Sequence, residues 1–235
     1  MTAHLYQNLI LKNPKIIFTI LIITILSFGY YSKDFRLDAS SETLLIEGDP
    51  DLAYLKEVTK RYDSKDFLIL TYTPNEGMVS DNSINNLLSL KYKIQSLEWV
   101  HSVITLLDIP LLDSSDSPLH ERLENFKTLK DENVDRDRGF KEILNSPVFR
   151  NYVISENGKT SAAIVNIKEN KKLENIENKS KKEIEKYKDN IKKQNHENIL
   201  EIRQVIQSYG DVGTIYLGGI PMIADDMMTF IKSDI

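Results

Sequence analysis

Residues 16–31 form an apolar run without a single charged side chain, and this run restricts the fold more than any other part of the sequence. A bilayer core about 30 Å thick needs roughly 20 helical residues, and Ser32 with the stem of Lys15 extends the run to that length. Pro14 suits the first turn of a helix, so we expect the helix to begin there. The sequence therefore predicts a transmembrane helix over residues 16–32.

Two other interpretations of the run remain open. A cleaved signal peptide has a short basic start and a small-residue cleavage site, whereas residues 1–15 precede this run and Tyr30 to Phe35 lack an Ala-x-Ala pattern. A buried helix of a soluble protein normally keeps a polar stripe, which is missing here. We therefore favour a retained membrane anchor.

Flanking charges bear on the orientation of this helix. Lys12 and Lys15 precede it, and Lys33 and Arg36 follow it among acidic residues. Because the positive-inside rule counts lysine and arginine, these flanks are nearly balanced. The short tail and the long following domain favour a cytoplasmic tail at residues 1–15 and a main domain in the periplasm or outside the cell, anchored in a bacterial inner (plasma) membrane.

The composition beyond the run is that of a globular domain. The chain has 235 residues, of which 41% are hydrophobic and 28% charged, enough for one core. A net charge of −5 argues against a nucleic-acid partner, and the absence of cysteine excludes disulfides and thiolate chemistry.

Periodicity and turn residues predict the elements of this domain. Residues 33–65 form a connecting segment with a helix near residues 51–62. Strands are expected at residues 66–73, 100–107 and 214–217, and a hairpin at residues 151–155 and 160–168 with a two-residue turn at Asn157-Gly158. Helices are expected at residues 81–97, capped by Ser80 or Asp81, and at residues 176–209.

The order strand, helix, strand, strand, helix, strand predicts an α+β fold of the ferredoxin-like βαββαβ type over residues 66–218. Residues 108–148 interrupt this order and read as an insertion with short helices at residues 120–129 and 139–144. Residues 219–235 alternate Met, Ile and Phe with Asp and Lys, which is typical of an amphipathic helix. We expect this helix to lead into a second membrane span outside the sequence, so that the chain is a fragment.

Catalytic and metal-binding patterns are not found in the sequence. The four histidines are isolated and lack ligand spacing, and each reads as solvated or packed: His4, His101, His120 and His196. Asp225-Asp226 reads as a solvated helix face, because neighbours on a helix point about 100° apart. No catalytic, cofactor-binding or metal-binding residue is assigned, no cofactor is expected, and the chain is not expected to be an enzyme.

The order of the segments resembles the start of a resistance-nodulation-division (RND) exporter, in the branch related to MmpL, hopanoid and Patched-type transporters. The resemblance lies in the first helix, then Phe35-Arg36-Leu37-Asp38-Ala39-Ser40, then the α+β domain, then Gly219-Ile220-Pro221 and Asp234. It implies two halves, each with one membrane helix, an extracytoplasmic porter domain and five further helices.

The resemblance also implies a function. Protons moving through carboxylates of the central helices would drive export of a hydrophobic or lipid-like substrate, and none of those helices lies in this sequence. The implied partners are the lipid bilayer, the remainder of the same transporter and the substrate, and a homo-oligomer is compatible with this arrangement. The alternative is a single-span protein whose outer domain senses a ligand or binds a partner.

Overall fold

The computed structural model describes residues 14–32, 49–62, 66–113, 118, 126–168 and 180–234. Contacts between residues divide the chain into two units, Met1–Asp38 and Ala39–Ile235. The first unit contains the predicted apolar helix, and the second contains the sheet and the helices packed on it. Of the connecting segment predicted at residues 33–65, the structure describes residues 49–62.

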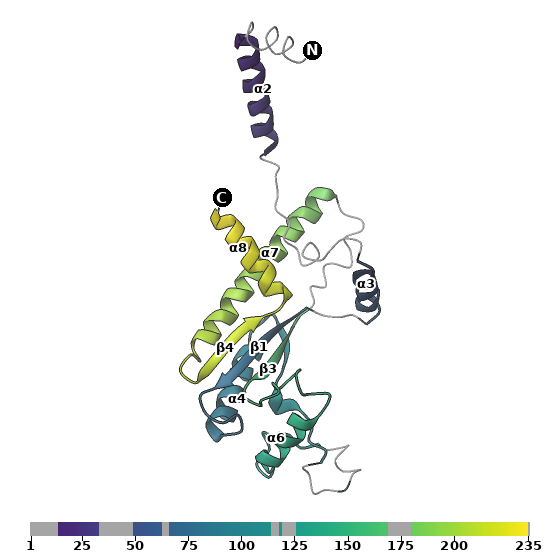
Figure 1. Ribbon diagram of the computed structural model, residues 1–235, viewed down its shortest axis with the longest axis vertical. Coiled ribbons are helices and arrows are strands. Elements are labelled where there is room, and N and C mark those ends of the chain that lie inside the picture. The colour runs from purple at the N-terminus through teal and green to yellow at the C-terminus, as the bar shows by residue number, and fades with distance from the viewer. Residues whose placement is uncertain are drawn as a thin grey trace, which may run out of the picture. The chain divides into compact units, whose positions relative to one another are not determined.

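Helix α2, Pro14–Ser32, is the predicted apolar helix, and none of its residues is buried (Figure 1). Its hydroxyl groups bond back to the helix, as Thr19 Oγ1 donates to the Lys15 carbonyl at 2.9 Å and Thr24 Oγ1 to the Ile20 carbonyl at 2.8 Å. Within the described part of the chain, α2 is the one helix long and apolar enough to cross a membrane. A membrane anchor and a signal sequence both fit this description.

A four-stranded antiparallel sheet forms the centre of the second unit. Its strands are β1 (Phe67–Pro74), β2 (Val100–Ile104), β3 (Ser161–Ile167) and β4 (Gly213–Gly218), in the order β2-β3-β1-β4. The strand predicted at residues 66–73 is β1, and its side chains Leu68, Leu70 and Tyr72 are buried on one face. The mixed helix-and-sheet class predicted from the sequence is therefore confirmed.

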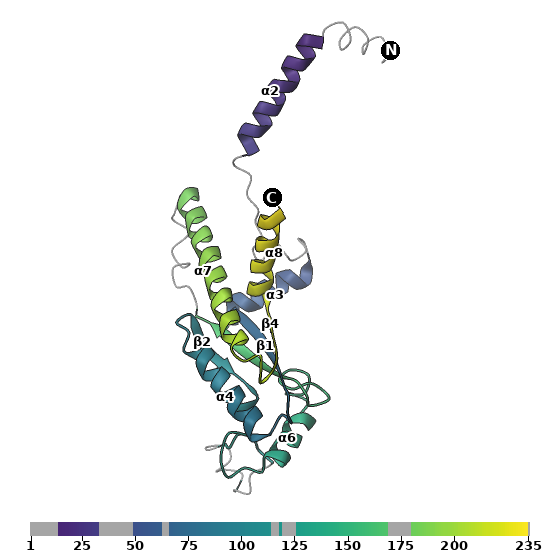
Figure 2. The ribbon, with the colours of Figure 1, turned by 90° about the vertical axis from the view of Figure 1, so that its left-hand side faces the viewer.

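Helix α4 (Asp81–Gln95) connects β1 to β2, and helix α7 (Lys181–Gln207) precedes β4. Both lie on the same side of the sheet (Figure 2). Ser80 caps α4 as predicted, because its side chain accepts a hydrogen bond from the backbone of Ser83. The apolar faces of the two helices close the main core with the sheet; this core includes Leu90, Ile94, Ile199, Ile202 and Val205.

A second apolar cluster lies where the predicted insertion meets α4. It is built from buried side chains of the insertion and its flanks, including Leu106, Leu107, Leu129, Ile143 and Ile154. Helix α6, Arg136–Asn145, supplies Ile143 and begins at the cap residue Asp135. The short helix predicted at residues 139–144 is therefore confirmed, with an earlier start.

Two predictions in this region are wrong or only partly right. Strand β2 ends at Ile104 and not at residue 107, because Thr105 and Asp108 form a capping box around a short 3-10 helix. A helix was predicted at residues 120–129, but residues 126–129, the part of it that the structure describes, are not helical. Instead, the Lys127 carbonyl accepts a hydrogen bond from the Leu111 amide at 2.8 Å.

The predicted hairpin is also different in detail. Residues 151–155 form only isolated bridges, since the amides of Val153 and Ile154 both bond to the Phe149 carbonyl in a tight turn. The connection to β3 holds four residues, because the Ser155 amide bonds to the Thr160 carbonyl. Gly158 alone in that connection has a positive φ, of 68°, so the predicted two-residue turn is wrong.

The remaining α-helices of the described ranges are α3, Pro50–Tyr62, and α8, Ile220–Asp234, and both were predicted. Gly219 joins β4 to α8 with a φ of 121°. A Cβ there would lie 3.0 Å from the Phe67 carbonyl and 3.1 Å from Leu68 Cα, so the turn requires glycine. Helix α7 begins at Lys181 and not at residue 176, and residues 169–179 lie outside the described part.

Candidate functional site at the junction of helices α7 and α8

The most developed polar arrangement of the second unit joins α7 to α8. Asp225 of α8 is only 7% exposed, and its carboxylate contacts the ring of His196 on α7. The distances from His196 Nδ1 to the two carboxylate oxygens are 2.9 and 3.1 Å. A buried carboxylate is costly without a partner, and His196 is the partner that the described residues provide.

Two further interactions extend this arrangement. Arg203 Nη2 donates to both carboxylate oxygens of Asp226 at 2.8 Å, and Asn195 Nδ2 donates to the Pro221 carbonyl at 2.9 Å. We refer to the five polar residues of this arrangement as the α7–α8 clamp: Asn195, His196, Arg203, Asp225 and Asp226. The Asn195 contact also satisfies a carbonyl of the first turn of α8, so the clamp spans the first two turns of that helix.

Helical spacing explains how the clamp forms. His196 and Arg203 are seven residues apart, which is about two turns, and so they lie on one face of α7. Asp225 and Asp226 are neighbours and point about 100° apart, so each carboxylate reaches a different one of these two side chains.

The sequence prediction for these residues needs correction. Asp225 is not part of a solvated face, and His196 is not isolated. The seven-residue spacing of His196 and Arg203 was a signal that they share a face. The sequence could not show which acidic residues that face would meet, because α7 and α8 are separated by β4.

Helix α8 presents an apolar stripe away from the clamp. The stripe consists of residues spaced three, four and three apart, and each is exposed: Ile220 at 51%, Ile223 at 46%, Met227 at 39% and Phe230 at 68%. On the packed side, Met222 contacts the main core. The helix is therefore apolar on two sides, one of them covered and one uncovered.

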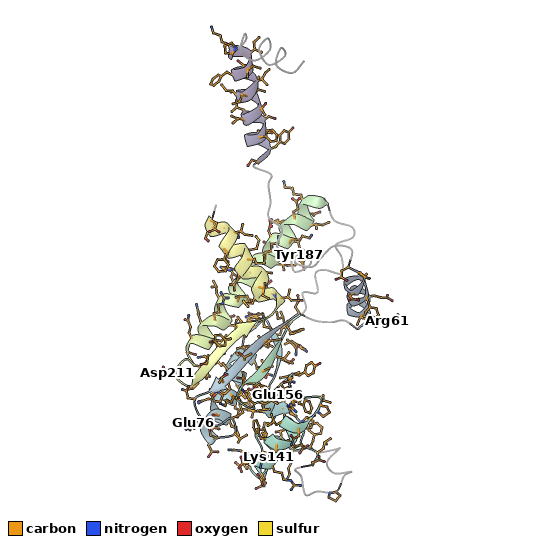
Figure 3. All side chains as sticks on the ribbon, in the orientation of Figure 1. Arg61, Glu76, Lys141, Glu156, Tyr187 and Asp211 are labelled. Carbon is orange, nitrogen blue, oxygen red and sulfur yellow. The ribbon has the colours of Figure 1, made fainter. Side chains whose placement is uncertain are left out.

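The N-terminal half of α7 carries a tyrosine whose hydroxyl is buried. Tyr187, labelled in Figure 3, lies on this half of the helix. Its hydroxyl is shielded from solvent and has no hydrogen-bond partner among the described residues.

A second charged cluster stabilises the start of the insertion. Asp108 accepts hydrogen bonds from the Lys91 ammonium, from the Thr105 amide at 2.8 Å and from Thr105 Oγ1 at 3.0 Å. Burial by itself would raise the pKa of Asp108, but the Lys91 and Thr105 hydrogen bonds outweigh it, so the pKa is lower than the ordinary 3.8. Because Lys91 is 12% exposed, this cluster serves the packing of α4 on the insertion.

Other candidates for chemistry are weaker. No group of three or more metal-ligating side chains occurs within the described ranges. His101 is exposed on β2, whereas His4 and His120 lie outside those ranges. A shallow hollow of about 420 Å³ in the insertion is lined by Phe126, Lys127 and residues 131–133, which do not form a nucleophile–base pair.

Comparison with known proteins does not add a family. No protein-family model matches the chain, and no curated protein matches it. The functional argument therefore depends on the residues and on the fold.

Proposed function

We propose that the chain is the N-terminal part of an RND-type exporter, consisting of its first membrane helix and its first porter domain. The observation that carries this proposal is the order of parts along the chain. An apolar helix of membrane length comes first, then a sheet in the order β2-β3-β1-β4 with helices on one side, then a helix with an uncovered apolar stripe. The same order underlies the resemblance found in the sequence.

The strand order supports a ferredoxin-like topology. In a βαββαβ chain, the first and third strands occupy the centre of the sheet, and each helix crosses over the same face. Here β1 and β3 are central, α4 lies between β1 and β2, and α7 lies between β3 and β4. The residues from Asp108 to Val148 are then an insertion between the second and third strands.

We further propose that α2 is retained as an anchor, with residues 1–15 in the cytoplasm and the second unit outside it. In this arrangement the uncovered stripe of α8 continues into a second membrane helix. The α7–α8 clamp would then hold that helix in a fixed direction on the porter domain. Movement of the porter domain during transport would be passed through His196–Asp225 and Arg203–Asp226.

The substrate class that fits this proposal is hydrophobic or lipid-like. The resemblance implies that the proton-coupling carboxylates lie in central helices of the exporter. Helix α2 cannot supply them, because it holds no acidic residue. A single-span sensor remains the competing function, and the first of the two experiments below separates it from the exporter.

The first experiment is sequencing of the locus downstream of residue 235. The exporter proposal requires an open reading frame that continues into about five apolar spans, whereas a stop codon at that point supports the sensor.

The second experiment maps topology in intact cells. The chain has no cysteine, so Tyr152→Cys, at a side chain that is 76% exposed, introduces a single thiol into the second unit. A membrane-impermeant maleimide should label this variant and leave the matched control Thr2→Cys, in the tail, unlabelled. Membranes from the same cells are also washed with alkaline carbonate, and release of the protein by this wash would overturn the proposed anchor. The opposite labelling pattern would overturn the proposed orientation.

A further inference from the structure

The face of the sheet opposite α4 and α7 is unusually free of charge. The four strands together contain no Asp, Glu, Lys or Arg, in a chain with 28% charged residues. On this face the strand register forms two neighbouring rows of side chains. One row is Ile104, Ile164 and Ile69, and the next is Ala162, Thr71 and Tyr216.

Several of these side chains are exposed. The exposed fractions are 44% for Phe67, 36% for Ile69, 42% for Ile104 and 68% for Tyr216. An antiparallel sheet with one face in water normally carries polar residues on that face. Figure 2 shows α4 and α7 together on the other side, so these helices do not cover it. The face therefore exposes apolar side chains and carries no charged residue, which is a composition that a partner can cover.

Two pairs of polar side chains at this face bond to each other. Thr73 Oγ1 and Thr160 Oγ1 are 2.8 Å apart, and Asn166 Nδ2 donates to Ser102 Oγ at 2.9 Å. A partner can therefore cover the face without supplying an ion or a hydrogen bond to these four residues. This favours an uncharged, apolar partner surface.

We propose that this face is a docking surface for the same face of a second copy of the chain. A neutral face can meet itself without charge repulsion, and a two-fold axis near Thr71 would lay one isoleucine row against the other. Two sheets packed in this way lie about 10 Å apart with their strands nearly aligned.

The size of the face fits a weak pair, at the lower limit of specific interfaces. The four exposed side chains named above leave roughly 400 Å² uncovered per copy, taking about 200 Å² for a whole large side chain. Two copies with their partly exposed neighbours then approach the roughly 1,200 Å² of the smallest specific interfaces. The dimer is accordingly weak and reversible, and it forms more readily where both copies are tethered to one surface. This inference does not depend on the exporter proposal.

Cross-linking of the purified full chain in detergent tests the proposal directly. Because the chain has no cysteine, Thr71→Cys places one thiol at the centre of the face, and Asn85→Cys places one on the exposed side of α4 as a matched control. A short bis-maleimide should join Thr71→Cys chains into dimers at least several-fold more efficiently than Asn85→Cys chains. Equal yields would overturn the proposal, because association through α2 would treat both positions alike.

A charge placed on the face gives a second readout. In the Thr71→Cys background, Ile69→Lys should abolish the cross-link, whereas Tyr92→Lys, on α4 and 60% exposed in the parent, should leave it unchanged. Circular dichroism of both variants checks that they are folded. A folded Ile69→Lys chain that still dimerises overturns the proposal, and so does a cross-link in cells to a different polypeptide only.

Discussion

Replacing His196 by alanine tests whether the α7–α8 clamp holds α8 on the domain. The substitution leaves the Asp225 carboxylate, which is 7% exposed, without the ring that contacts both of its oxygens. Removing one partner of a fully buried ion pair costs about 3–5 kcal/mol. The His196 side chain is 43% exposed, and water can reach the vacated position, so we expect a smaller loss of about 1–2 kcal/mol.

Two alanine variants on the same helix set the scale. Arg203→Ala removes a pair whose side chains are 38% and 32% exposed, and it should cost about 0.5–1 kcal/mol. Lys193→Ala removes a pair with 78% and 63% exposure and should be nearly neutral. Because alanine has the highest helix propensity at all three positions, any loss of stability comes from the lost contacts.

The assay is urea unfolding of the full chain in detergent, followed by the fluorescence of Trp99. Trp99 is the only tryptophan and is buried in the main core, where its ring nitrogen donates to Glu201 at 2.8 Å. Hydrogen exchange should also show faster exchange in α8 than in β1 for His196→Ala. The reasoning is refuted if His196→Ala is no less stable than Lys193→Ala and the exchange of α8 is unchanged.

Three further predictions concern the sheet and the insertion. Gly213→Ala would place a Cβ 2.6 Å from a backbone oxygen of β1 and should cost about 1–3 kcal/mol in urea unfolding, whereas Gly77→Ala meets nothing within 4 Å and should be neutral or slightly stabilising. Leu70→Ala, at a fully buried position, should cost about 2–5 kcal/mol, and Ile69→Ala, on the open face of the same strand, less than about 1 kcal/mol; equal losses would contradict the assignment of the two faces. Asp108 has a lowered pKa, so its contribution to stability is present at neutral pH and is lost as the pH falls through its folded value, below 3.8. Unfolding free energies measured from pH 7 to pH 2 should fall less steeply for Asp108→Asn than for the parent, and parallel curves would contradict the lowered pKa.

Local signals in the sequence were sufficient for most of the elements. The apolar run predicted α2, the cap Ser80 predicted the start of α4, and the strand-forming residues at 66–73 predicted β1. These features depend on residues within a few positions of one another. The wrong predictions occurred where a distant contact or a side-chain cap competes with the local pattern, as at Thr105 and at Asn157-Gly158.

The candidate site was much less predictable. The sequence assigned no role to His196, and it treated Asp225 and Asp226 as solvated. Their pairing depends on how β4 and the Gly219 turn bring α8 back onto α7, and no short sequence window contains that information.

The sequence by itself determined that the chain has one apolar helix of membrane length, followed by an α+β domain with a long polar helix and a short amphipathic one. Hydrophobic periodicity and capping are local properties, so they are readable without a structure. Only the tertiary structure decided the strand order, the side of α8 that is covered, the pairing of His196 with Asp225, and which uncharged strand residues share the face opposite α4 and α7. These depend on contacts between residues far apart in the chain, which form only when the backbone brings the elements together.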